Sequence, residues 1–181
     1  MNALIHHTRC RRLAKARLLN APSFRLPLKT AWVAVLSLLL LNQPAMAETP
    51  IDERQDAAAD GHVEVINISG TVEVTGWEND EVTVTGTLGR GVERLDFVVD
   101  GDRTRIEVIY PENVRSEGSD LIIRVPAGSS LDVRTVSASI KAAGVTGQQW
   151  LNSVSGDVSS EIFGSDLEAE TVSGSLDVSG T

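Results

Sequence analysis

The chain has 181 residues, of which 41% are apolar, and this fraction is enough for a packed core, which excludes a wholly disordered protein. Only 4% of the residues are aromatic, whereas valine, serine, threonine and glycine dominate after residue 61, so an all-β fold is predicted. Residues 48–181 hold nine basic and 25 acidic side chains, a balance that argues against nucleic acid and anionic lipid as direct partners.

Residues 1–47 predict a signal peptide. They hold seven Lys or Arg and no acidic residue, and they include the eleven uncharged residues Ala31–Leu41. Small residues at Ala45 and Ala47 complete an A-x-A ending, so we expect cleavage after Ala47 and an exported chain, periplasmic or at the cell surface. An uncleaved anchor is the alternative, although eleven residues fall short of the roughly 20 that cross a bilayer as a helix.

Two further features of this leader bear on export. A twin-arginine signal at Arg11-Arg12 is an alternative, but 18 residues separate that pair from the apolar stretch. The long basic region is also explained by a start codon assigned too far upstream. The single cysteine, Cys10, lies in the leader, so we expect no disulfide in the exported chain.

Residues 48–60 are polar and aperiodic, which predicts a flexible lead-in before a domain spanning 61–181. From His62 to Leu88 valines alternate with polar residues, the pattern of strands with one buried face. Ser69-Gly70 and Asn79-Asp80 predict turns between these strands. Further strands are predicted at Arg94–Val99, Thr104–Tyr110 and Leu121–Val125, with a hairpin at Asp100-Gly101-Asp102.

An 18-residue repeat begins after Gly128 and aligns three segments on Val136, Val154 and Val172. The other columns at this offset are Val133/Leu151/Ala169, Ser137/Ser155/Ser173, Ala138/Gly156/Gly174 and Ile140/Val158/Leu176. This period predicts that N-terminal β-hairpins lead into a parallel β-solenoid with 18-residue coils.

Coils about 4.8 Å apart require side chains of similar size in each column. We therefore expect the Val136 and Ile140 columns to point inward, the small residue between them to permit a bend, and the Ser137 column to face outward or hydrogen-bond along its stack. The chain ends at Thr181 within the third coil, which predicts either a domain truncated at its C-terminus or an open edge available to a partner.

The mature region resembles the putative-adhesin β-strand-repeat proteins, a bacterial family of unknown function. The matching stretches are Val63–Gly89 with its Gly76-Trp77 strand end, Leu121–Val133 with its VP-x-G-x-x-L junction, and the Ser-Val-Ser-Gly-Asp-Val coils that follow. The resemblance implies an exported, repetitive β fold, often at the cell envelope. Members usually continue through more coils than this chain.

No pattern in the sequence predicts catalysis, a metal site or a cofactor. His62 is the only histidine after the leader, and without a nucleophile elbow it is expected to be a surface strand residue. Asp100-Gly101-Asp102 with Thr104 faintly resembles a calcium loop, but a hairpin turn is the favoured interpretation. The repeat also holds several carboxylates that do not recur at the 18-residue offset and predict a solvated face: Asp157, Glu161, Asp166, Glu168 and Glu170.

A binding surface is the remaining site class. Its candidate residues are Trp77, Trp150, Ser137, Ser155, Ser173 and Asp157. For the two tryptophans, packing within the fold is the favoured interpretation and stacking on a sugar is the alternative. The leading hypothesis is a non-enzymatic exported scaffold or adhesin-like surface whose partner is envelope polysaccharide or another envelope protein. The alternatives are a carbohydrate-active β-helical enzyme, which two carboxylates facing each other across a cleft would favour, and a protein-interaction module of an envelope-stress system, which a bare apolar edge would favour.

Overall fold

The structure is a computed structural model that describes residues 48–112 and 115–180. The predicted signal peptide, its cleavage site and Cys10 lie outside the described residues, and residues 45–181 form a compact unit of their own. The described residues form eleven strands and no helix, which confirms the all-β prediction. No helix that could span a membrane is therefore found in this part of the chain.

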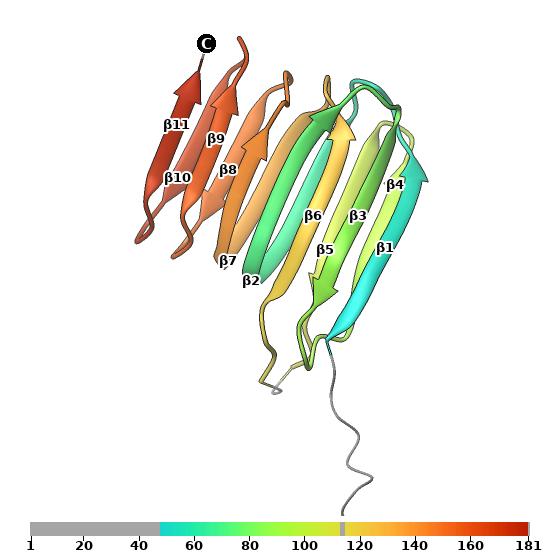
Figure 1. The fold of residues 1–181 in the computed structure, drawn as a ribbon, viewed down its shortest axis with the longest axis vertical. Helices are drawn as coiled ribbons and strands as arrows, with labels where there is room; N and C mark the ends of the chain where they lie inside the picture. The colour runs from blue at the N-terminus through green and yellow to red at the C-terminus, as the bar shows by residue number, and fades with distance from the viewer. Residues whose placement is uncertain (1–47, 113–114, 181) are drawn as a thin grey trace, which may run out of the picture. The chain divides into compact units, whose positions relative to one another are not determined.

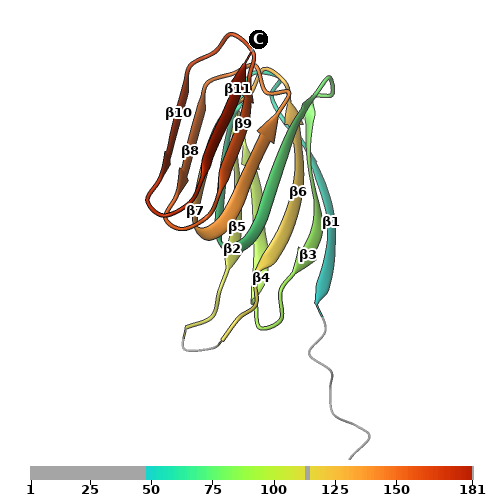
Figure 2. The same cartoon turned by 60° about the vertical axis from the view of Figure 1, so that its left-hand side comes forward.

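The strands are β1 (Thr49–Asp56), β2 (His62–Trp77), β3 (Glu81–Leu88), β4 (Arg94–Asp100), β5 (Arg103–Ile109), β6 (Ser119–Pro126), β7 (Ser130–Ala143), β8 (Gln149–Ser153), β9 (Val158–Ile162), β10 (Leu167–Thr171) and β11 (Leu176–Gly180). They lie in two layers, seen face-on in Figure 1 and turned in Figure 2. Layer A contains β4, β5, β8, β10 and the first halves of β2 and β7. Layer B contains β1, β3, β6, β9, β11 and the second halves of β2 and β7.

Parallel pairing builds a stack of five levels, each with one strand segment in either layer. In order along the stack the levels are β5/β6, β2, β7, β8/β9 and β10/β11. Within β7 to β11 every partner lies 18 residues away, so Leu131 pairs with Gln149 and Gln149 with Leu167. The predicted offset is therefore the true pairing register of the C-terminal part.

The sheet as a whole is mixed, which corrects the expectation of a parallel solenoid entered from simple hairpins. β4 pairs antiparallel with β5, β3 with β6, and β1 with β3. The antiparallel strands β1, β3 and β4 therefore cover the β5/β6 level of the stack in both layers. The sheet edge that they form closes one end of the molecule with strands that do not continue the repeat.

The lead-in prediction is also wrong, because Thr49–Asp56 is the strand β1 and not a flexible segment. Its eight residues pair in register with β3, and Gln55 Nε2 donates to the carbonyl oxygen of Phe97 in layer A at 2.8 Å. Polar composition concealed this strand because an edge strand with an exposed outer face needs few apolar residues.

The predicted turns have different outcomes. The hairpin at Asp100-Gly101-Asp102 is confirmed between β4 and β5, with Gly101 at a positive φ of 62°. Ser69-Gly70 is instead a corner inside the continuous strand β2, where the chain passes from layer A to layer B. After Asn79-Asp80 the chain enters β3, which pairs with β6 and β1, so β2 and β3 do not form a hairpin.

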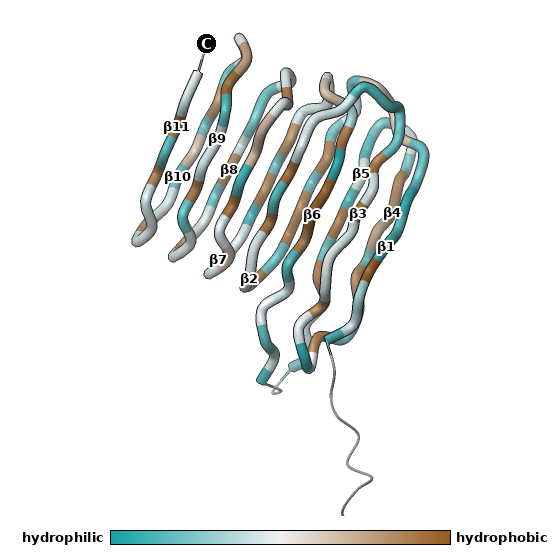
Figure 3. Tube along the Cα trace, in the orientation of Figure 1, coloured by the Kyte–Doolittle hydropathy of each residue, from teal (hydrophilic) through white to brown (hydrophobic). Residues whose placement is uncertain are grey.

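The core lies between the layers and consists mainly of alternate residues from strands β2 to β9, visible as alternating bands in Figure 3. Its fully buried aliphatic side chains include Val65, Ile106, Ile123, Leu131 and Leu151. Alternation by two places every second side chain on one face, so a buried core and a polar exterior follow from the strand pattern alone.

The Val136 column corrects a prediction about which side chains point inward. Val136 and Val154 are each 47% exposed and Val172 is 73% exposed, so all three point outward. Ile140 and Val158 of the other predicted column are buried, as expected. The reason is a corner within β7, where the chain passes from layer A to layer B. The inward-pointing residues are 131, 133 and 135 before the corner and 138, 140 and 142 after it, so the alternation takes one step of three in place of two.

The corner carries a buried polar column that the sequence analysis missed. Thr135 and Ser153 point inward, their hydroxyl oxygens lie 3.0 Å apart, and Ser153 Oγ accepts a hydrogen bond from the backbone of Gly156 at 2.8 Å. A Cβ at Gly156 would lie 2.0 Å from the carbonyl oxygen of Ala138, so glycine permits this close approach. Thr171 repeats the arrangement one level later by donating to the carbonyl oxygen of Gly156.

Candidate functional site

The outer face of layer A contains a hollow centred on Trp150. It has a volume of about 290 Å³ and is lined by His62, Asp132, Arg134, Trp150 and Asn152. These residues come from the adjacent strands β2, β7 and β8, so three levels of the stack contribute to one surface.

Strand alternation explains why these side chains face solvent. Leu151 of β8 is fully buried, so its neighbours Trp150 and Asn152 point to the opposite side. The same holds in β7 for Asp132 and Arg134, which flank the buried Val133. The hollow thus lies on the side of the sheet opposite the buried Val133 and Leu151.

The aromatic part of the hollow is formed by Trp150 and His62. Their ring centroids lie 6.4 Å apart with an interplanar angle of 64°, an edge-to-face arrangement. His62 Nδ1 also lies 3.0 Å from the hydroxyl oxygen of Ser130, which fixes the imidazole on the β7 side. Trp150 remains partly exposed on the outer face of layer A.

The polar part is a chain of ion pairs across three strands. Arg134 Nη1 lies 3.2 Å from Glu64 Oε1, and Arg105 Nη1 lies 2.9 Å from Glu64 Oε2. Arg134 also donates to Asp132 Oδ2. The second oxygen, Asp132 Oδ1, is shielded from solvent and has no hydrogen-bond partner within the described chain. Asp132 is therefore held through one carboxylate oxygen, by Arg134.

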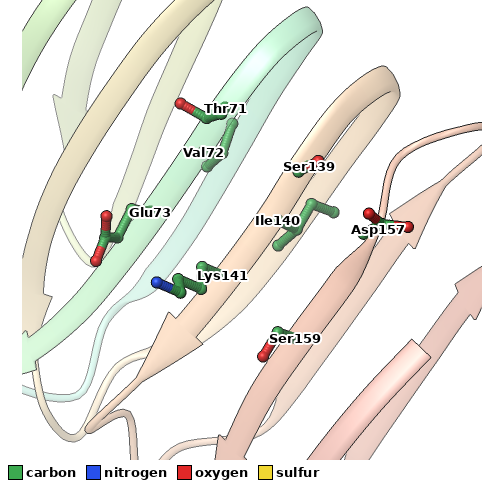
Figure 4. Close-up of a pocket in the computed structure, with 8 residues that line it drawn as sticks. All are labelled: Thr71, Val72, Glu73, Ser139, Ile140, Lys141, Asp157 and Ser159. Carbon is green, nitrogen blue, oxygen red and sulfur yellow. The ribbon is translucent and has the colours of Figure 1, made fainter. Parts of the chain in front are cut away.

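A second hollow lies on the outer face of layer B and is shown in Figure 4. Its volume is about 360 Å³, and its lining consists of Thr71, Val72, Glu73, Ser139, Ile140, Lys141, Asp157 and Ser159. The two aliphatic residues are buried, and the remaining lining side chains are short or charged. This surface offers no aromatic ring.

The two predicted tryptophans lie on opposite layers and do not form one site. Trp77 lies on the outer face of layer B, where Nε1 donates to the carbonyl oxygen of Glu81 at 2.9 Å. The guanidinium of Arg124 lies 5.6 Å from its ring centroid. Trp77 thus contacts Glu81 and Arg124, as Trp150 contacts His62, and both indoles are partly buried.

The other predicted surface residues gather at or beside the corner. Ser137, Ser155 and Ser173 are exposed there, beside the outward valine column. Asp157 is exposed in the layer B hollow, and its Oδ1 accepts a hydrogen bond from the backbone of Ser175 at 2.8 Å. The structure does not bring these residues together with Trp150.

The acidic residues of the repeat are divided between surfaces. Asp157 lines the layer B hollow, whereas Glu161 lines a separate hollow beside Phe163 at the end of β9. Among the described residues no group of three or more His, Cys, Asp or Glu could hold a metal ion. Asp100 and Asp102 belong to the β4–β5 hairpin.

Three residues of the layer A hollow were missed by the sequence analysis: Asp132, Arg134 and Asn152. The signal was available, because the 18-residue offset aligns Asp132 with Trp150 and Glu168, and Arg134 with Asn152 and Glu170. The sheet register pairs these positions directly. These columns are hard to recognise in the sequence because their members differ in chemistry, whereas a repeat is recognised by similar side chains at a fixed offset.

The last level of the stack has a bare edge in the described part of the chain. β10 and β11 each pair with one strand, and no further strand lies beyond them up to residue 180. Leu176 and Val178 are 49% and 43% exposed there, and Phe163 is 42% exposed.

The comparisons with known proteins give distant neighbours. No protein-family model and no curated protein matches the chain. A putative cell adhesion protein from Clostridium sporogenes has 8% identity and a TM-score of 0.49, covering 74% of this chain and 100% of that one. A putative adhesin from Parabacteroides merdae has 7% identity and a TM-score of 0.30, covering 74% of this chain and 96% of that one. At this distance the two descriptions remain statements about those two proteins.

Proposed function

We propose that the chain is a non-enzymatic exported β-repeat protein that acts as a binding surface of the cell envelope. The 18-residue parallel levels from β7 to β11 are, in this proposal, the coils of a short β-solenoid that serves as a rigid support. The outer face of layer A is the binding surface, and the mature chain works in the periplasm or at the cell surface.

The observation that supports this function is the hollow at Trp150. A partly exposed indole lies beside the side chains of Asp132, Arg134 and Asn152. Sugar rings present apolar faces that pack on aromatic side chains, and their hydroxyl groups bond to carboxylate, guanidinium and amide groups. Envelope polysaccharide is therefore the ligand class that this combination fits.

Co-sedimentation tests the binding function directly. Residues 45–181, which form a compact unit, are mixed with isolated cell-wall polysaccharide and with peptidoglycan, and the bound fraction is measured. We expect binding that is lost in Trp150→Ala and retained in Trp77→Ala, the matched tryptophan on layer B. Equal loss in both variants, or binding by neither the wild type nor the variants, would overturn the proposal.

The same assay tests the absence of catalysis. Soluble sugar released from the pellet is measured with the wild-type chain and with Asp157→Asn and Glu161→Gln. We expect no release above background from any of them. Release by the wild type that disappears in either variant would make the protein a carbohydrate-active enzyme.

A second candidate function is supported by the bare edge at β10 and β11. Unpaired backbone groups and the exposed Leu176 and Val178 suit the addition of a partner strand, which is a common mode of peptide recognition. Val178→Asp is expected to abolish such an interaction without changing polysaccharide binding, because layer A is untouched. Crosslinking of the exported protein in intact cells, with and without this substitution, measures it.

A further inference from the structure

We propose that the layer A hollow recognises a free amino group of an amino sugar. The amino group is held over Trp150, between the carboxylates of Asp132 and Glu168. This inference rests on the binding function proposed above and names its ligand class. Three adjacent strands carry these residues. Asp132 of β7 pairs with Trp150 of β8, and Trp150 pairs with Glu168 of β10. All three lie on the outer face of layer A, on neighbouring strands about 4.8 Å apart, so Trp150 stands between Asp132, which lines the hollow, and Glu168, which lies on the next strand.

The charges around the hollow leave these two carboxylates incompletely neutralised. Arg134 donates to Asp132 Oδ2, but Asp132 Oδ1 is shielded and without a partner in the described chain. Glu168 is exposed, and none of the ion pairs between described residues includes it. The guanidinium of Arg134 is shared between Asp132 and Glu64, and that of Arg105 between Glu64 and Glu107, so neither arginine pairs with Glu168.

An ammonium group satisfies this arrangement. It supplies donors to the exposed carboxylate of Glu168, which is in no ion pair between described residues, and an indole face attracts a cation by the electrostatics of its ring. A neutral N-acetyl group supplies a single N–H and no charge, so the acetylated form of the same sugar should bind less well.

The remaining residues of the hollow favour an amino sugar over a lysine side chain. Asn152 and Arg134 present an amide and a guanidinium beside the indole, and these groups bond to hydroxyl oxygens. A lysine side chain has one charged group and no hydroxyl groups to occupy them. A protein ligand would leave the polar half of the hollow without partners.

The test compares two probes by isothermal titration calorimetry with residues 45–181: a tetramer of β-1,4-linked glucosamine and its fully N-acetylated counterpart. We expect the free amine to bind about tenfold more tightly at low salt, and this preference to shrink as salt rises. Glu168→Gln should remove most of the preference, while Glu73→Gln, an exposed acid on layer B, should leave it unchanged. Glu168 makes no contact that folding requires, so this variant keeps the test valid if Asp132→Asn unfolds.

The outcomes separate this inference from the function on which it rests. Equal affinity for both tetramers, abolished by Trp150→Ala, would overturn the amino-group assignment and retain the polysaccharide surface. No binding of either tetramer together with no co-sedimentation would overturn both. Tighter binding of a tetralysine peptide than of the glucosamine tetramer would also reject the inference and point to a protein ligand.

Discussion

The two ends of the stack differ although their levels are built alike. At one end β3 and β4 cover the β5/β6 level, and Ile106 and Ile123 are fully buried. At the other end, among residues up to 180, the β10/β11 level has a neighbour on one side only, and Leu176 is 49% exposed. Leu176 belongs to the same column as Ile140 and Val158, which are buried.

This difference shows that burial here depends on position in the stack more than on residue type. A side chain of a given column is buried where the stack has a level on both sides of it, and it is exposed where a level is missing on one side. Repeat folds behave in this way because each unit contacts only its neighbours. The contribution of a residue to stability should therefore fall from the interior levels toward the bare edge.

The largest expected effect compares two truncations in one column. Ile140→Ala creates a cavity between two covered levels and should lower the free energy of unfolding by about 3 kcal/mol. Leu176→Ala removes a half-exposed side chain and should cost about 1 kcal/mol or less. Chemical denaturation of residues 45–181 measures both values. Similar losses in the two variants would mean that the last level is covered in solution.

An intermediate effect is expected at the corner. Ser153→Ala removes the acceptor of the Gly156 backbone donor and a partner of Thr135, both shielded from water, and should cost about 1–2 kcal/mol. Ser155→Ala, two residues later and exposed, should change the free energy of unfolding by less than about 0.5 kcal/mol. Thermal unfolding of the two variants tests whether the buried hydroxyl column, and not the exposed serine column, supports the stack.

The smallest expected effect on stability concerns the ion pair between Arg90, in the loop after β3, and Glu117, in the loop before β6. Arg90 Nε donates to Glu117 Oε2 at 2.9 Å, and this bond lowers the pKa of the Glu117 carboxyl. Because the folded-state pKa is depressed, the contribution of the pair is present above the ordinary carboxyl range and is lost as pH falls through the depressed value. Both side chains are about half exposed, so the global unfolding midpoint should hardly move.

An NMR titration of the Glu117 carboxyl measures this shift. Arg90→Ala should return the pKa toward the ordinary value of a glutamate, because the donor is lost. A titration that is the same with and without Arg90 would show that the pair does not persist in solution. In either outcome the stability of the stack should be unchanged. The titration therefore reports on electrostatics in the loops and not on packing of the core.

Much of the fold could be predicted from the sequence because alternation and the repeat are local signals. The strands near Arg94, Thr104 and Leu121 were placed within two residues of their observed bounds, and the 18-residue offset is the observed register. β1 could not be predicted, since its outer face is exposed and its pairing with β3 is set by tertiary contact.

The corner explains the main error in the core prediction. Val136 and Ile140 are four residues apart, so uninterrupted alternation puts both on the same face. The corner adds one residue to the inward step, and Val136 turns outward while Ile140 stays inward. A column of aliphatic residues in the sequence therefore does not establish burial when a bend lies between two strands.

The candidate site was predictable only in part. Trp150 was identified as one of two large aromatic residues after the leader, whereas Asp132 and Asn152 are ordinary surface residues when each is considered alone. Their significance comes from parallel pairing, which brings residues 18 positions apart to neighbouring places on one face. Trp77 was identified by the same reasoning, but contact with Arg124 and Glu81 occupies it.

The separation of β2 and β7 along the chain has a consequence for folding kinetics. His62 and Ser130 are in contact across 68 residues, whereas Thr135 and Ser153 meet across 18. Loop closure over the longer span costs about 1 kcal/mol more entropy, so the C-terminal coils can form contacts earlier than the junction between β2 and β7. The fastest contacts and the most stable ones thus lie in different parts of the stack. Strand β7 belongs to both parts, so its pairing with β2 should be the slow step that completes the native structure.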